Sequence, residues 1–489
     1  MDVLIVNVNN SRKKIYQDLS KDFSAVDTPF WAALTAGFLR NNHCSVTILD
    51  ANAKNLDHDE TVGIIEKVDP KLVAIVVYSQ QANVSTPIMM AVRSLCKTIK
   101  AKNPLRKVII TGWHPSALPK RTLEEEECDY VAQGEGFYTL LGLTKGDPYE
   151  NIPGLWWKNG GLIKNGAAPH IIHDLDNELS DVAWDLLPFE DNPYRAFNWM
   201  CLQDIDNRDH SVSMLTSLGC PFRCDFCAIH ATYGEHKVRN WSTAWVMKQI
   251  DILVNQYSVK NINFNDELFI YKPEHYLPIA HGIIEKKYNL NMCAFARVDV
   301  LNKVDQAELK ILKKAGFNWF KLGIESCNPD SLKSVSKGSF SKEIIRNVVN
   351  KVHEAGIDIC ANFMFGLPND DFEKMHENFL FALELQCSFP SFFCTMAIPG
   401  SNLYEEAVQN NIPLPETWLG YASQGYDFFP LPTKYLSSAD ILAFRDYAFD
   451  AYFKNPGYLD MIGKKFGLKA KTHISEMTKI KLKRKLLND

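Results

Sequence analysis

The sequence has little of several features that mark specialised classes of protein. It holds 12 cysteines among 489 residues, too few for the disulfide-rich scaffold of a small secreted protein. The longest strongly apolar run, 72–78, is far short of the roughly 20 residues that a membrane-spanning helix needs. The N-terminus, 1–6, has the pattern of a strand and lacks the basic region of a secretory signal. We therefore expect a cytoplasmic protein without a transmembrane segment.

A large charge of one sign is also lacking. Lys and Arg total 53 against 58 Asp and Glu, and the net charge of −5 argues against a protein that binds nucleic acids. Apolar residues make up 46% and charged residues 23% of the chain, which excludes a disordered or fibrous protein. At about 150 residues per domain, a chain of this length is expected to form two or three domains.

The first 145 residues alternate short apolar runs with segments of helical spacing. Continuous apolar runs of this kind are typical of strands buried on both faces of a sheet. The predicted strands are 3–8, 45–49, 71–78, 107–111 and 129–132. Strands that alternate with helices predict a doubly wound parallel sheet, in which ligands bind at the carboxyl ends of the strands.

A second alternation of strands and helices begins at Val212. Its predicted strands are 212–216, 261–265, 292–296, 319–323, 358–365 and 391–397. Six βα units predict an open sheet or a partial barrel, with the chemistry at the carboxyl ends of the strands. The predicted division of the chain is 1–145, a tryptophan-rich connecting segment 146–205, 206–430 and a mostly helical region 431–489.

The last part of the chain contains a basic stretch, 464–485, with few acidic residues. One interpretation is a solvated helical face. The alternative is a contact surface for an anionic partner or substrate.

Three cysteines lie within eight residues, directly after the first strand of the second half. Cys220, Cys224 and Cys227 have the spacing C-x3-C-x2-C, and Phe226 precedes the third. Three thiolates on one loop can bind three irons of a [4Fe–4S] cluster and leave the fourth iron open to a substrate. With His230, the same cysteines could instead form a zinc site in a non-enzymatic binding protein.

The cysteine motif resembles that of the radical S-adenosylmethionine (radical SAM) superfamily. Further motifs similar to those of this family follow in the same order, each at a later strand end. They are 264–269, 295–299, 323–326 with 337–338, 365–368 and 399–404. The resemblance covers residues 206–430. It implies a partial (β/α)6 barrel, a [4Fe–4S] cluster on the three cysteines, bound SAM and an external low-potential electron donor.

The resemblance also implies which residues contact SAM, and they lie at strand ends or on the cysteine loop: Phe226, Asp266, Glu267, Arg297, Glu325, Ser326 and Gly366. Carboxylates suit the SAM ammonium group, and a guanidinium can pair with its carboxylate. The remaining residues are expected around ribose and adenine. A structural alternative exists for four of them: Asp266 and Glu267 as surface acids, Arg297 as an ion-pair partner of Asp299 or of another acid, and Ser326 as a helix cap.

Residues 1–145 resemble the cobalamin (vitamin B12)-binding domain that precedes the radical SAM core in one large subfamily. The resemblance rests on Pro29 with its following helix, on Leu49-Asp50 and on short motifs at later strand ends. The cobalamin contacts that it implies are Ser79, Gln80, Gly112, Trp113, His114, Gly134, Glu135 and Gly136. Residues 7–11 lack the Asp-x-His-x-x-Gly motif of the cobalamin mutases. We therefore expect no protein histidine on the lower face of cobalt.

The two resemblances together imply a cobalamin-dependent radical SAM enzyme. The leading hypothesis is a methyltransferase that uses a 5′-deoxyadenosyl radical to methylate an unactivated carbon of a small metabolite. The alternative is a cobalamin-containing radical cyclase or rearrangement enzyme, which has the same architecture. In both cases the carboxyl edges of the two sheets are expected to face each other across the substrate.

Overall fold

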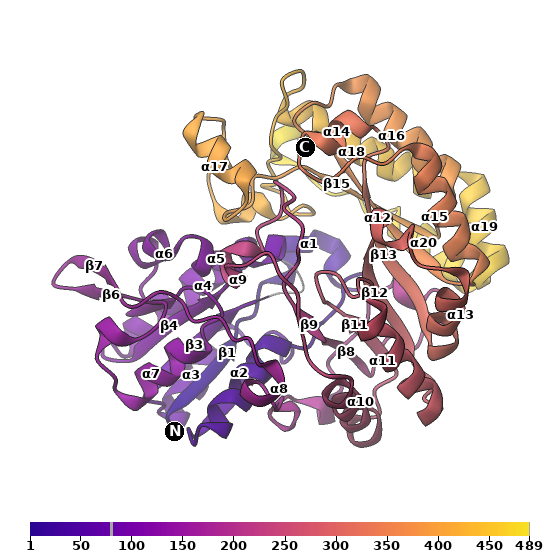
Figure 1. The fold of residues 1–489 in the computed structure, drawn as a ribbon. Helices are drawn as coiled ribbons and strands as arrows, with labels where there is room; N and C mark the ends of the chain where they lie inside the picture. Colours follow the sequence, from indigo (N-terminus) through magenta and orange to yellow (C-terminus); the bar gives the residue numbers. More distant parts are fainter. Residues whose placement is uncertain (79–81, 489) are drawn as a thin grey trace.

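In the computed structural model the chain folds into two α/β lobes that lie side by side (Figure 1). The structure describes residues 1–78 and 82–488. Two predicted cobalamin contacts, Ser79 and Gln80, lie outside the described residues. Within the described ranges, no helix is both long enough and apolar enough to cross a membrane.

The N-terminal lobe is built on a seven-stranded sheet with the order β2-β1-β3-β4-β5-β6-β7. Its first five strands pair in parallel, as predicted. They are β1 (Val3–Asn7), β2 (Val46–Asp50), β3 (Leu72–Val77), β4 (Lys107–Gly112) and β5 (Tyr130–Ala132). All six residues of β3 are buried, which accounts for its uninterrupted apolar sequence.

Helices cover both faces of this sheet. In β1, Val3 and Ile5 belong to the apolar cluster that contains α2 and α7, whereas Leu4 and Val6 pack with α3 and α4. This alternation follows from the two-residue period of a strand, and it confirms the predicted doubly wound arrangement. The helices of the lobe are α1 (Arg12–Tyr16), α2 (Phe30–Asn41), α3 (His58–Val68), α4 (Ala82–Lys102), α5 (Trp113–Ala117), α6 (Pro119–Glu125) and α7 (Phe137–Lys145).

Part of the predicted connecting segment joins the N-terminal sheet. Strands β6 (Leu155–Asn159) and β7 (Leu162–Asn165) form an antiparallel hairpin that extends the sheet beyond β5. Trp157 is buried in this hairpin and packs edge-on against Tyr149. The sheet therefore continues past residue 145, and the division of the chain at that residue stays a prediction.

The second lobe is a six-stranded parallel sheet with the order β15-β14-β13-β12-β11-β8. Each strand pairs with the next one along the chain, except for the short β9 and β10, and β8 and β15 form the two edges. The strands are β8 (Ser211–Met214), β11 (Asn261–Phe264), β12 (Asn291–Arg297), β13 (Phe317–Glu325), β14 (Asp358–Phe365) and β15 (Phe389–Cys394). This confirms the predicted partial (β/α)6 barrel.

One long helix follows each of the first five barrel strands, and most of these helices begin at a capping side chain. Ser242, Asp305, Ser341 and Asp371 each accept a hydrogen bond from a main-chain N–H of the first turn. The helices are α10 (Thr243–Tyr257), α11 (Pro273–Lys286), α13 (Gln306–Ala315), α15 (Lys342–Glu354) and α16 (Phe372–Leu385).

The C-terminal region is helical, as predicted, with α18 (Ser438–Phe453), α19 (Pro456–Phe466) and α20 (Leu468–Met477). Several lysines of the basic stretch form ion pairs with nearby carboxylates. The pairs are Lys465–Asp358, Lys469–Asp206, Lys471–Asp460, Lys479–Glu476 and Lys485–Glu416. Because these charges are used within the protein, the structure favours the solvated helical face over the anion-binding surface.

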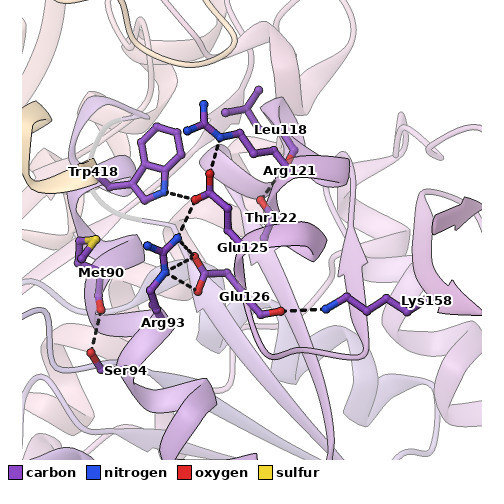
Figure 2. Close-up of polar contacts among 10 residues, drawn as sticks. All are labelled: Met90, Arg93, Ser94, Leu118, Arg121, Thr122, Glu125, Glu126, Lys158 and Trp418. Carbon is purple, nitrogen blue, oxygen red and sulfur yellow. Dashed lines mark hydrogen bonds and ion pairs between the residues drawn. The ribbon is translucent and has the colours of Figure 1, made fainter. Parts of the chain in front are cut away.

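A segment between the barrel and α18 returns to the N-terminal lobe. The short 3-10 helix η6 (Trp418–Tyr421) packs in the same apolar cluster as α4. The Trp418 indole donates a hydrogen bond to Glu125, which also accepts from Arg93 and Arg121 (Figure 2). Apolar packing and this charged network together fix the C-terminal part of the chain to the first lobe.

Candidate functional site

A cavity of about 690 Å³ is lined by residues from both sheets. In the N-terminal lobe, Asn10, Asn52, Tyr78 and Trp113 follow the carboxyl ends of β1, β2, β3 and β4. In the barrel, the lining includes Met214, Asn265, Glu267, Phe295, Lys321, Asn362 and Phe393. The two carboxyl edges therefore face one space, as the parallel sheets predicted.

The N-terminal edge of the cavity presents polar atoms that no described residue satisfies. Asn10 Oδ1, Asn52 Oδ1 and Trp113 Nε1 are buried and have no hydrogen-bond partner among the described residues. Each buried group without a partner costs about 1–3 kcal/mol, so these atoms indicate a ligand that both donates and accepts hydrogen bonds. The amide side chains around a corrin ring do both, and this set of protein groups therefore fits cobalamin.

Three predicted glycines shape the same edge. Gly112 has φ 144°, and a Cβ there would lie 2.4 Å from Val77 O. Gly136 has φ 80°, and a Cβ would lie 2.5 Å from Thr111 Oγ1. The Gly134 carbonyl accepts hydrogen bonds from Tyr78 and Ser116. Close packing of the strand ends thus explains why residues 112 and 136 are glycine, and their contact with cobalamin stays a prediction.

Two other predicted cobalamin contacts are not among the residues that line the cavity. His114 is buried in α5, with Nδ1 3.2 Å from Thr86 Oγ1 and its ring edge-on to Trp418. Burial lowers the pKa of His114 to about 3, so the ring is neutral. Glu135 forms a buried ion pair with Arg239 and accepts a hydrogen bond from Ile172 N. His114 Nδ1 and the Glu135 carboxylate are used within the protein, and the contact of both residues with cobalamin stays a prediction.

The three motif cysteines lie together on the loop between β9 (Ser217–Leu218) and α9 (His230–Tyr233). Burial, and to a lesser degree the neighbouring thiols, raises the pKa of Cys220 to about 11 and that of Cys227 to about 12. Buried thiols of this kind lose their protons only beside a cation, such as a bound iron ion. The loop is thus suited to hold a cationic cluster.

The zinc alternative is not supported by the side-chain geometry. The His230 ring nitrogens lie 2.8 Å from Phe222 O and 3.3 Å from Glu235 O, so both face main-chain carbonyls. In the described part of the chain, no three His, Cys, Asp or Glu side chains converge on a point where a single ion could sit. Separate thiols suit a cluster, because each of its irons takes one thiolate.

Arg297 stabilises the cysteine loop through side-chain contacts. Its guanidinium donates to both carboxylate oxygens of Asp299 at 3.0 Å, to Cys224 Sγ at 3.3 Å and to Lys337 O at 2.7 Å. It also stacks over the Phe222 ring at 3.7 Å. Four of its five N–H groups are thereby used within the protein. The structure supports the ion pair with Asp299, and only one N–H is left for the predicted contact with the SAM carboxylate.

Asp266 is buried, and one of its two carboxylate oxygens is used within the protein. Its Oδ1 accepts hydrogen bonds from Thr216 N, Thr216 Oγ1 and Ser217 Oγ at 2.6–2.9 Å. These bonds fix the chain that runs from β8 into the cysteine loop. Burial excludes the surface acid of the structural alternative. Its Oδ2 is buried without a partner among the described residues, and the contact of Asp266 with SAM stays a prediction.

Glu267, the next residue, faces the cavity. Its carboxylate accepts hydrogen bonds from Tyr233 Oη at 2.8 Å and from Gly219 N at 3.2 Å. Burial raises the pKa of Glu267 to about 7, which shows that a charged carboxylate here lacks full compensation. An ammonium ligand supplies that compensation, and Glu267 therefore fits the role predicted for SAM binding.

Glu325 ends β13 in the left-handed conformation, with φ 59°. Its carboxylate forms a buried ion pair of 2.5 Å with Lys337. A Cβ on Gly323 would lie 2.7 Å from that carboxylate, so a larger residue there would displace the ion pair. The Lys337 ammonium also lies 6.0 Å from the Phe226 ring. Lys337 thus lies between Phe226 and Glu325, two residues predicted to contact SAM. The sequence had predicted no contact for Lys337 itself.

The last two predicted SAM contacts follow β13 and β14. Ser326 Oγ accepts a hydrogen bond from Asn328 N, and Asn328 caps α14 (Pro329–Lys333). Ser326 is therefore not the helix cap of the structural alternative. Gly366 has φ 77°, and a Cβ there would lie 2.7 Å from Ile441 of α18. Contact of these residues with SAM stays a prediction.

Sequence reasoning missed Lys321 and Asp27, two charged residues that also line the cavity. Lys321 interrupts an apolar strand, and a charged residue in such a run is the signal that could have found it. Asp27 lies in a loop without a recognisable pattern and becomes conspicuous only in three dimensions.

Two protein-family models match the chain. The Radical SAM superfamily model matches residues 214–382, and the B12 binding domain model matches residues 24–144. Both matches lie within the regions that the motifs predicted.

Individual relatives and one solved structure agree with these models. An uncharacterized methyltransferase of Pyrococcus horikoshii is 29% identical over 400 residues, which cover 81% of this chain and 82% of that protein. An anaerobic magnesium-protoporphyrin IX monomethyl ester cyclase of Rubrivivax gelatinosus is 24% identical over 390 residues, which cover 77% of this chain and 66% of that protein. The radical SAM methyltransferase TsrM of Kitasatospora setae, solved with tryptophan and a SAM analogue, has the same fold, with a TM-score of 0.68 at 16% identity. The superposition covers 98% of this chain and 99% of that chain.

The matched models, the cysteine loop and the unsatisfied edge of the first lobe point to the same conclusion. The chain belongs to the radical SAM enzymes that carry an N-terminal cobalamin-binding domain.

Proposed function

We propose that the protein is a cobalamin-dependent radical SAM methyltransferase that methylates an unactivated carbon of a small metabolite. One observation carries the proposal: Glu267 beside the cysteine loop and the unpartnered groups of Asn10, Asn52 and Trp113 face the same cavity. A substrate in that cavity lies between the two cofactor sites.

The residues of the chain divide the work of holding the reactants. When bound, the cluster, SAM and cobalamin supply an electron, a 5′-deoxyadenosyl radical and a transferable methyl group. Cys220, Cys224 and Cys227 each offer one thiolate to iron, and Arg297 donates a hydrogen bond to Cys224. Glu267 accepts the SAM ammonium group. An external low-potential electron donor completes the set of partners.

Aromatic side chains exclude water from the region where a radical would form. Trp31, Tyr78, Trp113 and Tyr233 make a continuous wall with ring centroids 4.3–6.4 Å apart. Exclusion of water and stray reductants protects a reactive intermediate from side reactions. Among the described residues that line the cavity, none is a histidine. That cobalt carries no protein histidine stays a prediction from the sequence.

A radical cyclase is the second candidate, since a cyclase relative aligns with 77% of the chain. Anaerobic reconstitution with cobalamin, reductant and methyl-labelled SAM separates the two reactions. Methyl transfer should place label in the product and form both S-adenosylhomocysteine and 5′-deoxyadenosine. Turnover that gives 5′-deoxyadenosine and an unlabelled product would eliminate the methyltransferase in favour of the cyclase.

A further inference from the structure

Two charged side chains on the inner surface of the cavity have no role in the proposed function so far. Lys321 lies in the middle of β13 with an exposed fraction of 5%, and it faces the cavity. Asp27 lies just before α2 and faces the same cavity from the first lobe. Neither forms an ion pair with any described residue. One buried positive and one half-buried negative charge thus line a single space.

Neutral side chains set the spacing between these charges. Lys321 Nζ donates to Asn263 Oδ1 at 2.7 Å, and Asn263 Nδ2 donates to Ser213 Oγ at 3.1 Å. Ser213 Oγ in turn donates to Asp27 at 2.7 Å. Thr28 exchanges two further hydrogen bonds with the Ser213 main chain and so fixes this loop on β8. The charges are held near each other without contact.

Both charged groups have capacity left for a ligand. The Lys321 ammonium uses two of its three N–H groups, on Asn263 and Asn265, and it lies 3.7 Å from the Phe295 ring. Only Oδ1 of the Asp27 carboxylate accepts a hydrogen bond from a described residue. Burial lowers the pKa of Lys321 and raises that of Asp27 to about 6. Each charge therefore gains from a partner of opposite sign.

The geometry points to a binding site for the head group of an amino-acid substrate, with its carboxylate at Lys321 and its ammonium at Asp27. A zwitterion compensates both charges. A lone carboxylate would leave Asp27 without a counter-charge, and a lone amine would leave Lys321 without one. Phe295 and Phe393, which also line the cavity, flank the rest of such a molecule. The inference rests on the proposed function only in taking this cavity as the substrate site.

Three probes with one carbon skeleton test the assignment: L-phenylalanine, 3-phenylpropionate, which lacks the amine, and phenethylamine, which lacks the carboxylate. Their binding to the anaerobically reconstituted full chain is measured by calorimetry near neutral pH, without turnover. L-Phenylalanine should bind about tenfold or more tightly than either partial analogue, because a charge pair in a desolvated site contributes at least that much. Equal binding of the three probes, or no binding of L-phenylalanine, would overturn the inference.

Two variants assign each half of the head group. Lys321→Met should weaken L-phenylalanine binding by about tenfold or more and not weaken phenethylamine binding. Asp27→Asn should weaken L-phenylalanine similarly and not weaken 3-phenylpropionate binding. Lys481→Met, which removes a charge from the exposed rim of the cavity, is the matched control and should leave the ranking unchanged. An unchanged L-phenylalanine preference in either test variant refutes the assignment of that residue.

The outcome is distinguishable from failure of the proposed function. Cobalamin content and cluster absorbance report whether each variant folds and loads. If L-phenylalanine binds selectively but no substrate receives a labelled methyl group, the proposed function fails and the head-group site stands. If methyl transfer occurs with no selectivity among the probes, the proposed function stands and the head-group site is lost.

Discussion

The two edges that face the cavity have the same geometry but different chemistry. The N-terminal edge offers neutral amide and indole groups, and several of them have no partner among the described residues. On the barrel edge several charged groups are engaged: Arg297 pairs with Asp299, Glu325 pairs with Lys337, and Asp266 accepts three hydrogen bonds. A neutral, unsatisfied edge suits a large amide-rich cofactor. A charged edge that is held in place by ion pairs and hydrogen bonds suits a cluster and a small ionic ligand.

The largest expected effect is loss of the iron–sulfur cluster from the barrel edge while cobalamin still binds at the N-terminal edge. Cys224→Ala removes one thiolate and the acceptor of the Arg297 hydrogen bond, so we expect loss of the iron–sulfur absorbance and of all SAM cleavage. Cobalamin binding should remain. Cys327→Ala, which removes a buried thiol outside the loop, is the control and should keep the cluster. SAM cleavage by reconstituted Cys224→Ala would show that the ligand assignment is wrong.

The next prediction tests two neighbouring acids on the barrel edge. Glu267→Gln should weaken SAM binding by about tenfold to a hundredfold, because a hydrogen bond to a charged group contributes about 1.5–3 kcal/mol. Asp266→Asn should instead lower the midpoint of thermal unfolding, since its carboxylate holds the strand end. Equilibrium dialysis with SAM and a thermal melt separate the two. The same defect in both variants would contradict the division of roles.

A smaller effect is expected at the N-terminal edge. Trp113→Phe keeps an aromatic ring but removes the unpartnered Nε1–H, so cobalamin affinity should fall by about threefold to tenfold. Trp157→Phe, in the hairpin far along the same sheet, serves as the control. Titration of the apo-protein with cobalamin gives the affinities. Unchanged affinity in Trp113→Phe would mean that this indole does not face the corrin amides.

The smallest effect concerns pH. Burial raises the pKa of Asp27 to about 6, so the folded protein holds a proton that the unfolded chain releases near the ordinary pKa of 3.8. This contribution to stability is present at low pH and is lost as the pH rises from about 4 to about 6. In Asp27→Asn that loss of stability should disappear. At pH values above 6, the variant should therefore have a higher midpoint temperature of thermal unfolding than the original protein. If the midpoint temperatures of the two proteins change with pH in the same way, the raised pKa of Asp27 is contradicted.

Particular elements show why some predictions succeeded. The unbroken apolar sequence of β3 identified a strand buried on both faces, and the motif order located each barrel strand within a few residues. Other predictions needed distant partners. Glu135 was expected to face cobalamin, but Arg239 lies beside it in the fold and forms an ion pair with it. Nothing near residue 135 in the sequence announces that partner.

The sequence by itself determined the alternation of strands and helices in the two lobes and the position of the cysteine loop, because apolar runs and local motifs carry that information. Only the tertiary structure decided which of two adjacent acids faces the cavity, where His114 and Glu135 lie, and that Lys321 and Asp27 share one space. The physical reason is that the burial and charge state of a side chain depend on partners that the fold brings from elsewhere in the chain.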